Sequence, residues 1–161
     1  MPGTKTENNG LRVSEGALAL ITCRFGNDDC WFARWNRHWA KYSFVGGHRH
    51  DNESFRDCIV RELEEELALR SGDDYRLVDS EPIARLSYEA WSRSARCDTL
   101  YRMELFGVVL NGNAAGLSTK RPVRWLTRAE IEALQAGDGR QVSETMRRIL
   151  EQIHWRVLPG A

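Results

Sequence analysis

Three acidic side chains occupy positions in one segment where a folding helix would normally present apolar residues. At about 100° per residue, a helix over residues 54–69 places its apolar side chains on a single arc. Glu62 and Glu66 fall in the middle of that arc, Glu65 falls at its edge, and Glu64 points to water. Burying a carboxylate without a partner costs several kcal/mol, so this face of the helix requires a compensating positive charge.

A divalent cation would supply that charge. Mg²⁺ takes oxygen ligands and usually combines one or two carboxylates with waters and the phosphates of a substrate. Glutamates at spacings of three and four residues can converge on one such ion from a single helical face. The alternative is a solvated acidic helix whose ion-pair partners are Arg56 and Arg61. Gly47 and Glu53, which lie upstream at fixed spacing, favour the metal site.

The whole segment from Gly47 to Leu69 closely resembles the Nudix box of the Nudix hydrolases. That box reads G-x5-E-x7-R-E-U-x-E-E-x-G-U, where U is a bulky aliphatic residue. A match over so many fixed positions is far more specific than a lone glycine motif. The residues that match are Gly47, Glu53, Arg61, Glu62, Leu63, Glu65, Glu66 and Leu69.

Three positions depart from the family pattern. Ala68 replaces the Gly that usually ends the helix in a left-handed conformation, which Ala resists. We therefore predict that the helix continues to residue 70 or 71 and that Gly72 closes it. Val45 and Asn52 stand where the family usually carries Pro and Gly. Because Asn tolerates the left-handed conformation best among non-glycine residues, we expect the loop to be retained.

The resemblance implies a role for each matching side chain. Glu53 would help to hold a second ion or the loop, and Arg61 would orient the carboxylates by ion pairing. The general base would be Glu65, Glu66 or a carboxylate from a distant loop. The implied ligands of one to three Mg²⁺ or Mn²⁺ ions are the Gly47 carbonyl and the side chains of Glu62, Glu65 and Glu66.

Nudix enzymes hydrolyse a diphosphate that is joined to another moiety, and metal ions can neutralise the phosphate oxygens and activate the attacking water. The resemblance thus predicts a Mg²⁺-dependent pyrophosphohydrolase acting on a nucleotide or a nucleoside-diphosphate derivative. One alternative is a Nudix-fold module that binds a ligand without turnover, although such modules tend to lose the glutamates that are intact here. A second alternative is an isomerase of the same fold that acts on isoprenoid diphosphates.

Substrate selection lies outside the box. Arg34 stands where many Nudix strands carry an Arg that contacts substrate, and Trp35 beside it could stack on a base. Tyr88 is similar to a tyrosine found downstream of the box in diadenosine polyphosphate hydrolases. For each of these residues, packing or an exposed strand position is the competing interpretation. His48 and His50 lie close to the expected metal, and their roles stay open.

Composition places these features in one domain. The chain has 161 residues, of which 42% are hydrophobic, and we expect a flexible tail over residues 1–10 followed by a single Nudix hydrolase domain over 11–161. A formal net charge of zero argues against a general nucleic-acid or membrane surface. The lack of a membrane-span or signal pattern predicts a soluble cytoplasmic protein, with a homodimer left open. The four cysteines show no C-x-x-C spacing, so neither a zinc ribbon nor a disulfide framework is indicated.

Hydrophobic patterning predicts interleaved strands and helices. Thr127 and Glu130 form a capping box that opens a short helix through Gln135, and a final amphipathic helix begins near Gln141. This order fits an α/β protein, a Nudix-like α/β/α sandwich with a mixed sheet. The predicted strands cover residues 17–25, 31–36, 75–79, 83–91, 99–110 and 122–126, with a turn at 111–113.

Overall fold

The computed structural model describes residues 5–6, 10–112 and 122–159, in which α1 lies between two runs of strands and two further helices follow the last strand. The strands are β1 (Lys5–Thr6), β2 (Arg12–Phe25), β3 (Asp28–Asn36), β4 (Lys41–Ser43), β5 (Val45–His48), β6 (Tyr75–Leu77), β7 (Ala84–Ser92), β8 (Cys97–Leu110) and β9 (Val123–Thr127). The helices are α1 (Phe55–Leu67), α2 (Arg128–Ala133) and α3 (Glu144–Gln152). Most of the predicted tail and the end of the 111–113 turn lie outside the described residues, although β1 pairs with β2.

The described strands form one mixed sheet around the long strand β2. The order along the sheet is β4-β3-β2-β8-β6, while β5 also pairs with β2, β7 with β8 and β9 with β3. β2 and β8 run parallel, with Gly16 opposite Met103, and the other strand pairs are antiparallel. β5 pairs with the middle of β2 through Ala17 and Gly47, which anchors against the sheet the glycine pair at the start of the box, Gly46 and Gly47.

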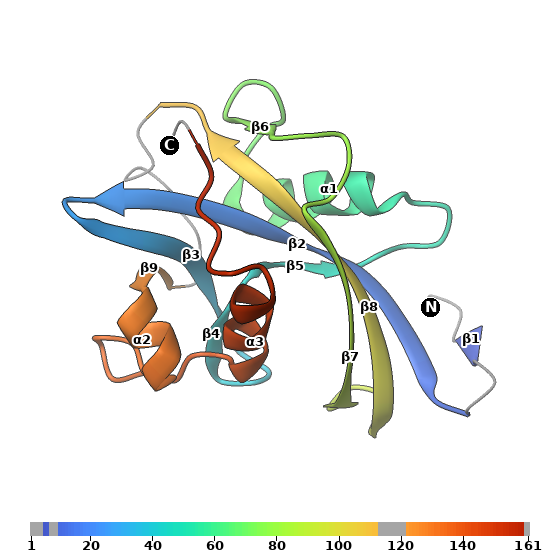
Figure 1. Ribbon diagram of the computed structural model, residues 1–161. Coiled ribbons are helices and arrows are strands. Elements are labelled where there is room, and N and C mark those ends of the chain that lie inside the picture. Colours follow the sequence, from blue (N-terminus) through green and yellow to red (C-terminus); the bar gives the residue numbers. More distant parts are fainter. Residues whose placement is uncertain (1–4, 7–9, 113–121, 160–161) are drawn as a thin grey trace.

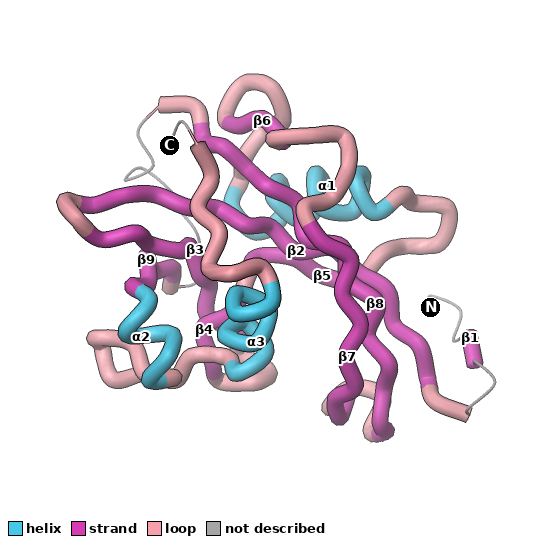
Figure 2. Tube along the Cα trace, in the orientation of Figure 1, coloured by secondary structure: helices cyan, strands magenta, loops and turns pink. Residues whose placement is uncertain are grey.

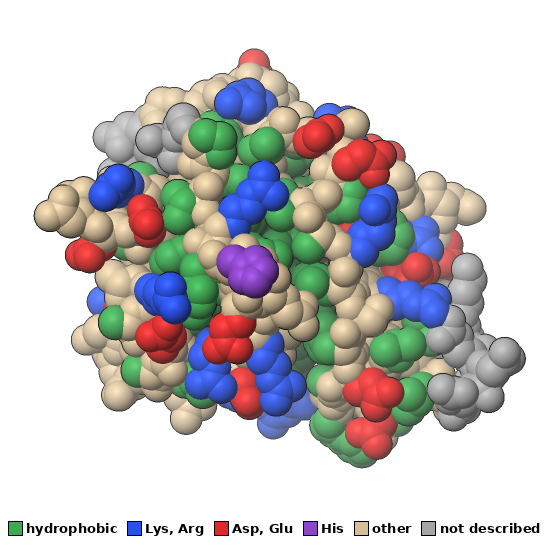
Figure 3. Space-filling view, viewed as in Figure 1, with side chains coloured by type: hydrophobic (Ala, Val, Ile, Leu, Met, Phe, Trp, Pro, Cys, Tyr) green, Lys and Arg blue, Asp and Glu red, His purple; other side chains and the backbone are tan. Residues whose placement is uncertain are grey.

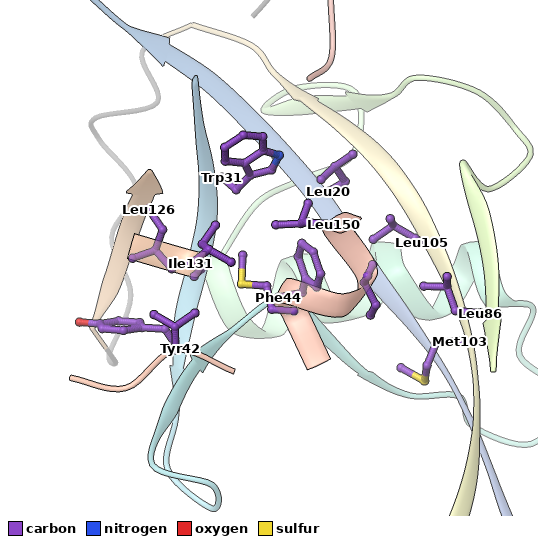
Figure 4. Close-up of a cluster of buried hydrophobic side chains, with 14 of the residues drawn as sticks. Leu20, Trp31, Tyr42, Phe44, Leu86, Met103, Leu105, Leu126, Ile131 and Leu150 are labelled. Carbon is purple, nitrogen blue, oxygen red and sulfur yellow. The ribbon is translucent and has the colours of Figure 1, made fainter. Parts of the chain in front are cut away.

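Helices cover both faces of this sheet. Figure 1 and Figure 2 show α1 on one side, and α2 and α3 on the other. Alternate residues of β2 serve the two layers, as the two-residue period of a strand requires. Ala19 packs in a buried cluster with Ile59 and Leu63 of α1, whereas Leu20 packs in a second cluster with Leu150 of α3. Figure 4 shows this second cluster. The predicted α/β/α sandwich is confirmed.

Helix α1 begins as its sequence predicts but ends early. The Ser54 hydroxyl accepts the Asp57 amide at 3.0 Å and caps the first turn. Ala68 adopts a left-handed conformation (φ 55°, ψ 34°), so the prediction that the helix continues past it is wrong. That conformation costs Ala about 1–2 kcal/mol. The Ala68 and Leu69 amides meet the carbonyls of Glu64 and Leu63, and the turn buries Leu69.

The two remaining helices are shorter than predicted. The capping box at Thr127 and Glu130 is present, but α2 ends at Ala133 because Leu134 turns left-handed (φ 56°). Ser143 caps α3, which therefore begins at Glu144 rather than near Gln141. The preceding residue, Val142, bridges to Tyr42 of β4 and ties the start of α3 to the sheet.

Two observations describe the apolar and charged parts of the molecule. No helix among the described residues is long and apolar enough to cross a membrane. On the face that carries α2 and α3, basic and acidic side chains are interspersed rather than gathered by sign (Figure 3).

Candidate active site

A cleft of about 550 Å³ opens beside the glycine pair of the box. Its walls come from β3, β5, the β7–β8 hairpin and α3, and the C-terminal end of α1 contributes Glu66. Much of the lining is apolar, including Leu18, Phe44 and Met103. Arg34 and Glu66 bring opposite charges to the same cleft. The sequence therefore places ionised groups beside a space large enough for a small ligand.

Close backbone approach brings the box glycines against α1. A Cβ at Gly47 would lie 2.3 Å from Glu62 Oε1, so only glycine leaves room for this carboxylate. A Cβ at Gly46, where φ is +152°, would lie 2.1 Å from the carbonyl oxygen of Ala17. The Gly47 carbonyl also lies 3.5 Å from the thiol of Cys58. This glycine pair thus forms a thin wall between β2 and the carboxylates of α1.

Arg61 gathers three carboxylates at the outer side of this wall. Its Nε and Nη2 donate to the two Glu53 oxygens at 2.8 and 3.1 Å, a bidentate pair. Its Nη1 donates to Glu62 at 3.0 Å and to Glu65 at 3.1 Å, and Nη2 also reaches the His48 carbonyl at 2.9 Å. The hydrogen bonds from Arg61 lower the pKa of Glu53 to about 2. Arg61 and Glu53 therefore hold the loop and orient the other carboxylates.

Glu62 and Glu66 meet on the cleft side of α1. Glu62 is only 8% exposed, and its carboxylate lies within hydrogen-bonding reach of Glu66. Burial, followed by the charge of Glu62, raises the pKa of Glu66 to about 7, although Arg34 opposes this shift. Glu64 and Glu65 are exposed. Helical spacing alone predicts that Glu62 and Glu66 lie together and that Glu64 faces solvent.

Arg34 reaches Glu66 from the opposite wall. Its Nη1 lies 3.0 Å from Glu66 Oε2, and the two side chains are 15% and 18% exposed. Backbone pairing with Ser43 of β4 and Val123 of β9 fixes Arg34 in the middle of β3. All four box glutamates thus face guanidinium groups from one of two arginines, Arg61 or Arg34.

The chemistry of this site fits a divalent cation. Glu62 and Glu66 are adjacent carboxylates in a partly buried site, and burial together with the charge of Glu62 raises the pKa of Glu66 despite the nearby Arg34 guanidinium. The available donors are oxygens, which suit Mg²⁺ or Mn²⁺. Within residues 10–112 and 122–159, no group of three or more acidic, His or Cys side chains is already arranged to hold a metal ion. The arginine contacts explain this, because they hold the carboxylates that would have to turn.

The structure brings together some of the residues that the sequence singles out. Arg34 and Tyr88 both line the cleft, and Tyr88 stacks on Tyr101 with ring centroids 5.4 Å apart. Trp35, on the other face of β3, does not line it. Its ring packs edge-on against Tyr42 at 5.4 Å and lies under the Arg140 guanidinium at 5.2 Å. The structure therefore separates Trp35 from the other candidate residues.

The two box histidines differ in position. The His48 Nδ1 lies 2.8 Å from the Ser14 hydroxyl, and its ring contributes to the cleft. Partial desolvation, with the nearby Arg12, lowers the pKa of His48. His50 is exposed, and its backbone amide donates to Glu53 at 3.1 Å. Only His48 is therefore placed to meet a ligand in the cleft.

Loop and helix residues complete the lining of the cleft. Trp39 and His38 come from the loop between β3 and β4, and the His38 carbonyl accepts a hydrogen bond from Arg93 of the β7–β8 hairpin. This contact joins the two loops at one end of the cleft. Met146 and Ile149 of α3 close another side. Their helical spacing predicts burial but carries no sign that they face a ligand.

The comparisons with known proteins agree with this geometry. The family model of the NUDIX domain matches residues 14–148. No protein with a curated description matches the chain in sequence. The chain belongs to the Nudix family, and the resemblance read from the box is confirmed. The family defines it as a hydrolase of phosphoric anhydride bonds.

Solved structures share the fold at low sequence identity. The E. coli dihydroneopterin triphosphate pyrophosphohydrolase aligns with a TM-score of 0.61 and 16% identity, covering 86% of this chain and 92% of that one. A C. elegans Ap4A hydrolase binary complex gives 0.61 and 12%, covering 88% and 96%. The NUDIX domain of Shewanella oneidensis NrtR, complexed with ADP ribose, gives 0.52 and 14%, covering 90% and 88%. At these identities the similarity establishes the fold alone.

Proposed function

We propose that the protein is a Mg²⁺-dependent pyrophosphohydrolase that cleaves a diphosphate linkage in a nucleotide or nucleoside-diphosphate derivative. One observation carries the proposal. Glu62 and Glu66 form a partly buried carboxylate pair at the wall of a cleft that also contains Arg34. Two adjacent, partly buried carboxylates suit a divalent cation, and an arginine in the cleft beside them suits a diphosphate.

The proposed ligands are the Gly47 carbonyl and the carboxylates of Glu62, Glu65 and Glu66. To reach the other ligands, Glu65 would have to leave Arg61, which its 57% exposed side chain permits by rotation. When bound, Mg²⁺ or Mn²⁺ neutralises phosphate oxygens and lowers the pKa of a water.

The protein's own side chains position the carboxylates, accept the proton and bind the substrate. Arg61 keeps Glu62 in place through its 3.0 Å contact and is itself held by Glu53. Glu66, at the wall of the cleft, is one candidate base that accepts a proton from the attacking water, and Glu65 is the other. Arg34 binds the diphosphate oxygens. Water then bonds to one phosphorus, and the second phosphate leaves with the bridging oxygen.

The apolar half of the cleft would hold the remainder of the substrate. Tyr88 and Trp39 offer ring faces or edges on which a base can pack. The structural neighbours include proteins named for Ap4A and dihydroneopterin triphosphate and one complexed with ADP ribose. These are diphosphate-containing compounds with a planar ring system, and they define the first compounds to assay.

The experiment is a substrate panel with Mg²⁺, Mn²⁺ or EDTA. It contains ADP-ribose, dinucleoside polyphosphates, nucleotide sugars and nucleoside triphosphates, with phosphate and nucleotide products measured. We expect release from at least one class with metal and none with EDTA. An isoprenoid diphosphate is assayed beside the panel, and its metal-dependent isomerisation would instead identify the isomerase alternative. Tight binding of a panel compound without release would favour the ligand-binding module.

A cytoplasmic, single-domain protein, with the domain spanning residues 11–161, fits this proposal, because the proposed substrates are intracellular metabolites. The proposal leaves the association of two copies open, and sedimentation of the purified protein measures it directly.

A further inference from the structure

The two arginines that face the box glutamates are held very differently. Arg61 has contacts that do not depend on the Glu62–Glu66 pair. It forms the bidentate bond with Glu53 and donates to the His48 carbonyl at 2.9 Å. If Glu62 turned to a new partner, these contacts would keep the Arg61 guanidinium where it is.

Within the described residues, Arg34 has no comparable support. Its ion pair with Glu66, 3.0 Å long, holds one end of the guanidinium. Its Nε is buried and has no hydrogen-bond partner among the described residues. The backbone of Arg34 is paired on both sides within β3, so movement is confined to a long side chain that already borders the cleft. Arg34 is therefore the counter-ion that can leave.

Glu66 cannot serve Arg34 and a metal ion equally well. Its carboxylate is already shared between the Arg34 guanidinium and the neighbouring Glu62. A divalent cation that engages this pair repels a guanidinium a few ångströms away and competes with it for the same oxygens. A planar guanidinium released into the cleft matches the geometry of phosphate oxygens.

We propose that Arg34 is an internal counter-ion that the metal must displace from Glu66, and that the displaced guanidinium then binds the substrate diphosphate. This inference rests on the proposed function. It adds that one side chain couples the two binding events: the metal frees Arg34 for phosphate, and phosphate keeps Arg34 away from the metal site. By linkage, each ligand then raises the affinity for the other.

The direction in which the metal affinity changes when Arg34 is removed distinguishes competition with the metal from a purely structural role. If Arg34 only supported the fold, its removal would leave metal binding unchanged or weaken it. If Arg34 competes with the metal, its removal must strengthen metal binding by the substrate-free protein. The test is therefore a titration of purified substrate-free protein with Mn²⁺, with free Mn²⁺ followed by electron paramagnetic resonance.

Arg34→Gln removes the charge and keeps a polar side chain. We expect it to bind Mn²⁺ about ten-fold more tightly than the unmodified protein, because a competing positive charge beside the site is lost. Arg34→Lys keeps the charge and should stay within about two-fold of the unmodified protein. Arg93→Gln removes another cleft cation that is bonded to His38 rather than to a box glutamate. It should also leave the affinity nearly unchanged.

Unchanged or weaker Mn²⁺ binding by folded Arg34→Gln would overturn the inference, and so would equal strengthening by Arg93→Gln. Thermal unfolding of each variant confirms that it is folded. The kinetic arm uses the best compound of the substrate panel, on which Arg34→Gln should raise KM despite its tighter metal binding. Failure of the unmodified protein to bind Mn²⁺ would overturn the proposed function itself, whereas normal metal-dependent turnover with unchanged Arg34→Gln affinity would overturn this inference alone.

Discussion

Gly47 and Glu62 are in direct contact, and a single methyl group between them would place Cβ 2.3 Å from the Glu62 Oε1 atom. The requirement for glycine at the start of the box is thus one of close approach, since a side chain here would push the carboxylate from its place. Glu62 in turn is held by Arg61 at 3.0 Å. A residue of strand β5 and a helix residue, 15 positions apart in the sequence, therefore fix one carboxylate beside the cleft.

Gly47→Ala tests this contact. The added methyl group must displace the Glu62 carboxylate, and misplacement of a catalytic group by about 1 Å can cost on the order of 10²-fold in rate. We expect turnover on the best panel substrate to fall by about this factor while the protein stays folded. Gly137→Ala is the control, because its Cβ would meet the flexible end of Arg124 at 2.7 Å. Similar losses in both variants would argue against the contact.

The sequence predicts those features of the site that depend on residues close together in the chain. Helical geometry alone places Glu62 and Glu66 together, and the left-handed Asn52 (φ 64°) follows from the tolerance of Asn for that conformation. The end of α1 at Leu67 does not follow, because burial of Leu69 outweighs the preference of Ala68.

Long-range contacts are harder to infer. The ion pair of Arg34 with Glu66 joins β3 to α1, and no local sequence pattern near either residue predicts it. Trp35 shows a second limit, because the sequence alone does not decide which face of β3 lies toward the cleft. Its neighbour Arg34 points into the cleft, and strand alternation then turns Trp35 to the other face. The register that decides between the two faces is set by pairing with β4 and β9.

The Glu53–Arg61 pair predicts a loss of stability in acid. The pKa of Glu53 is about 2 in the folded protein, below its ordinary value of 4.5. The folded state therefore gains stability that is present above pH 4.5 and is lost as pH falls through about 2. In EDTA, urea unfolding across this range should show a smaller decline for Glu53→Gln than for the unmodified protein. Glu64→Gln should leave the decline intact, and an equal decline in all three proteins would refute the assignment.

Glu66 predicts the opposite trend near neutrality. Its folded pKa of about 7 exceeds the ordinary 4.5, so the folded state holds this proton more tightly than the unfolded chain. Without metal, stability should decrease as pH rises from 4.5 to about 7. Glu66→Gln should reduce this slope, and Mg²⁺ should offset it in the unmodified protein by binding the ionised pair. Urea unfolding with EDTA or Mg²⁺ measures both effects, and a slope that Glu66→Gln leaves unchanged would count against the buried pair.

The position of Tyr88 in the cleft predicts that this residue contributes to substrate affinity. Tyr88 lines the cleft, whereas Trp91, on the same strand, is 57% exposed. Loss of an aromatic contact is worth about 0.5–1.5 kcal/mol, so Tyr88→Ala should raise KM by about 2- to 13-fold with a smaller change in kcat. Trp91→Ala should leave KM near its original value. Steady-state kinetics on the best panel substrate decide the matter, and equal KM values for the two variants would remove Tyr88 from the binding site.

The central claim is that the cleft-facing carboxylates carry the chemistry, and Glu66→Gln tests it most directly. This change keeps size and hydrogen-bonding capacity but removes the charge that a cation or a proton requires. We predict a fall in kcat of about 10²- to 10⁴-fold at saturating Mg²⁺. Glu64→Gln, on the solvent side of the same helix, should cost little. The measurement is kcat for both variants beside the unmodified protein, with thermal unfolding recorded for each. Equal turnover in the two variants, or a loss in Glu66→Gln that unfolding fully explains, would mean that these carboxylates serve the structure and not the reaction.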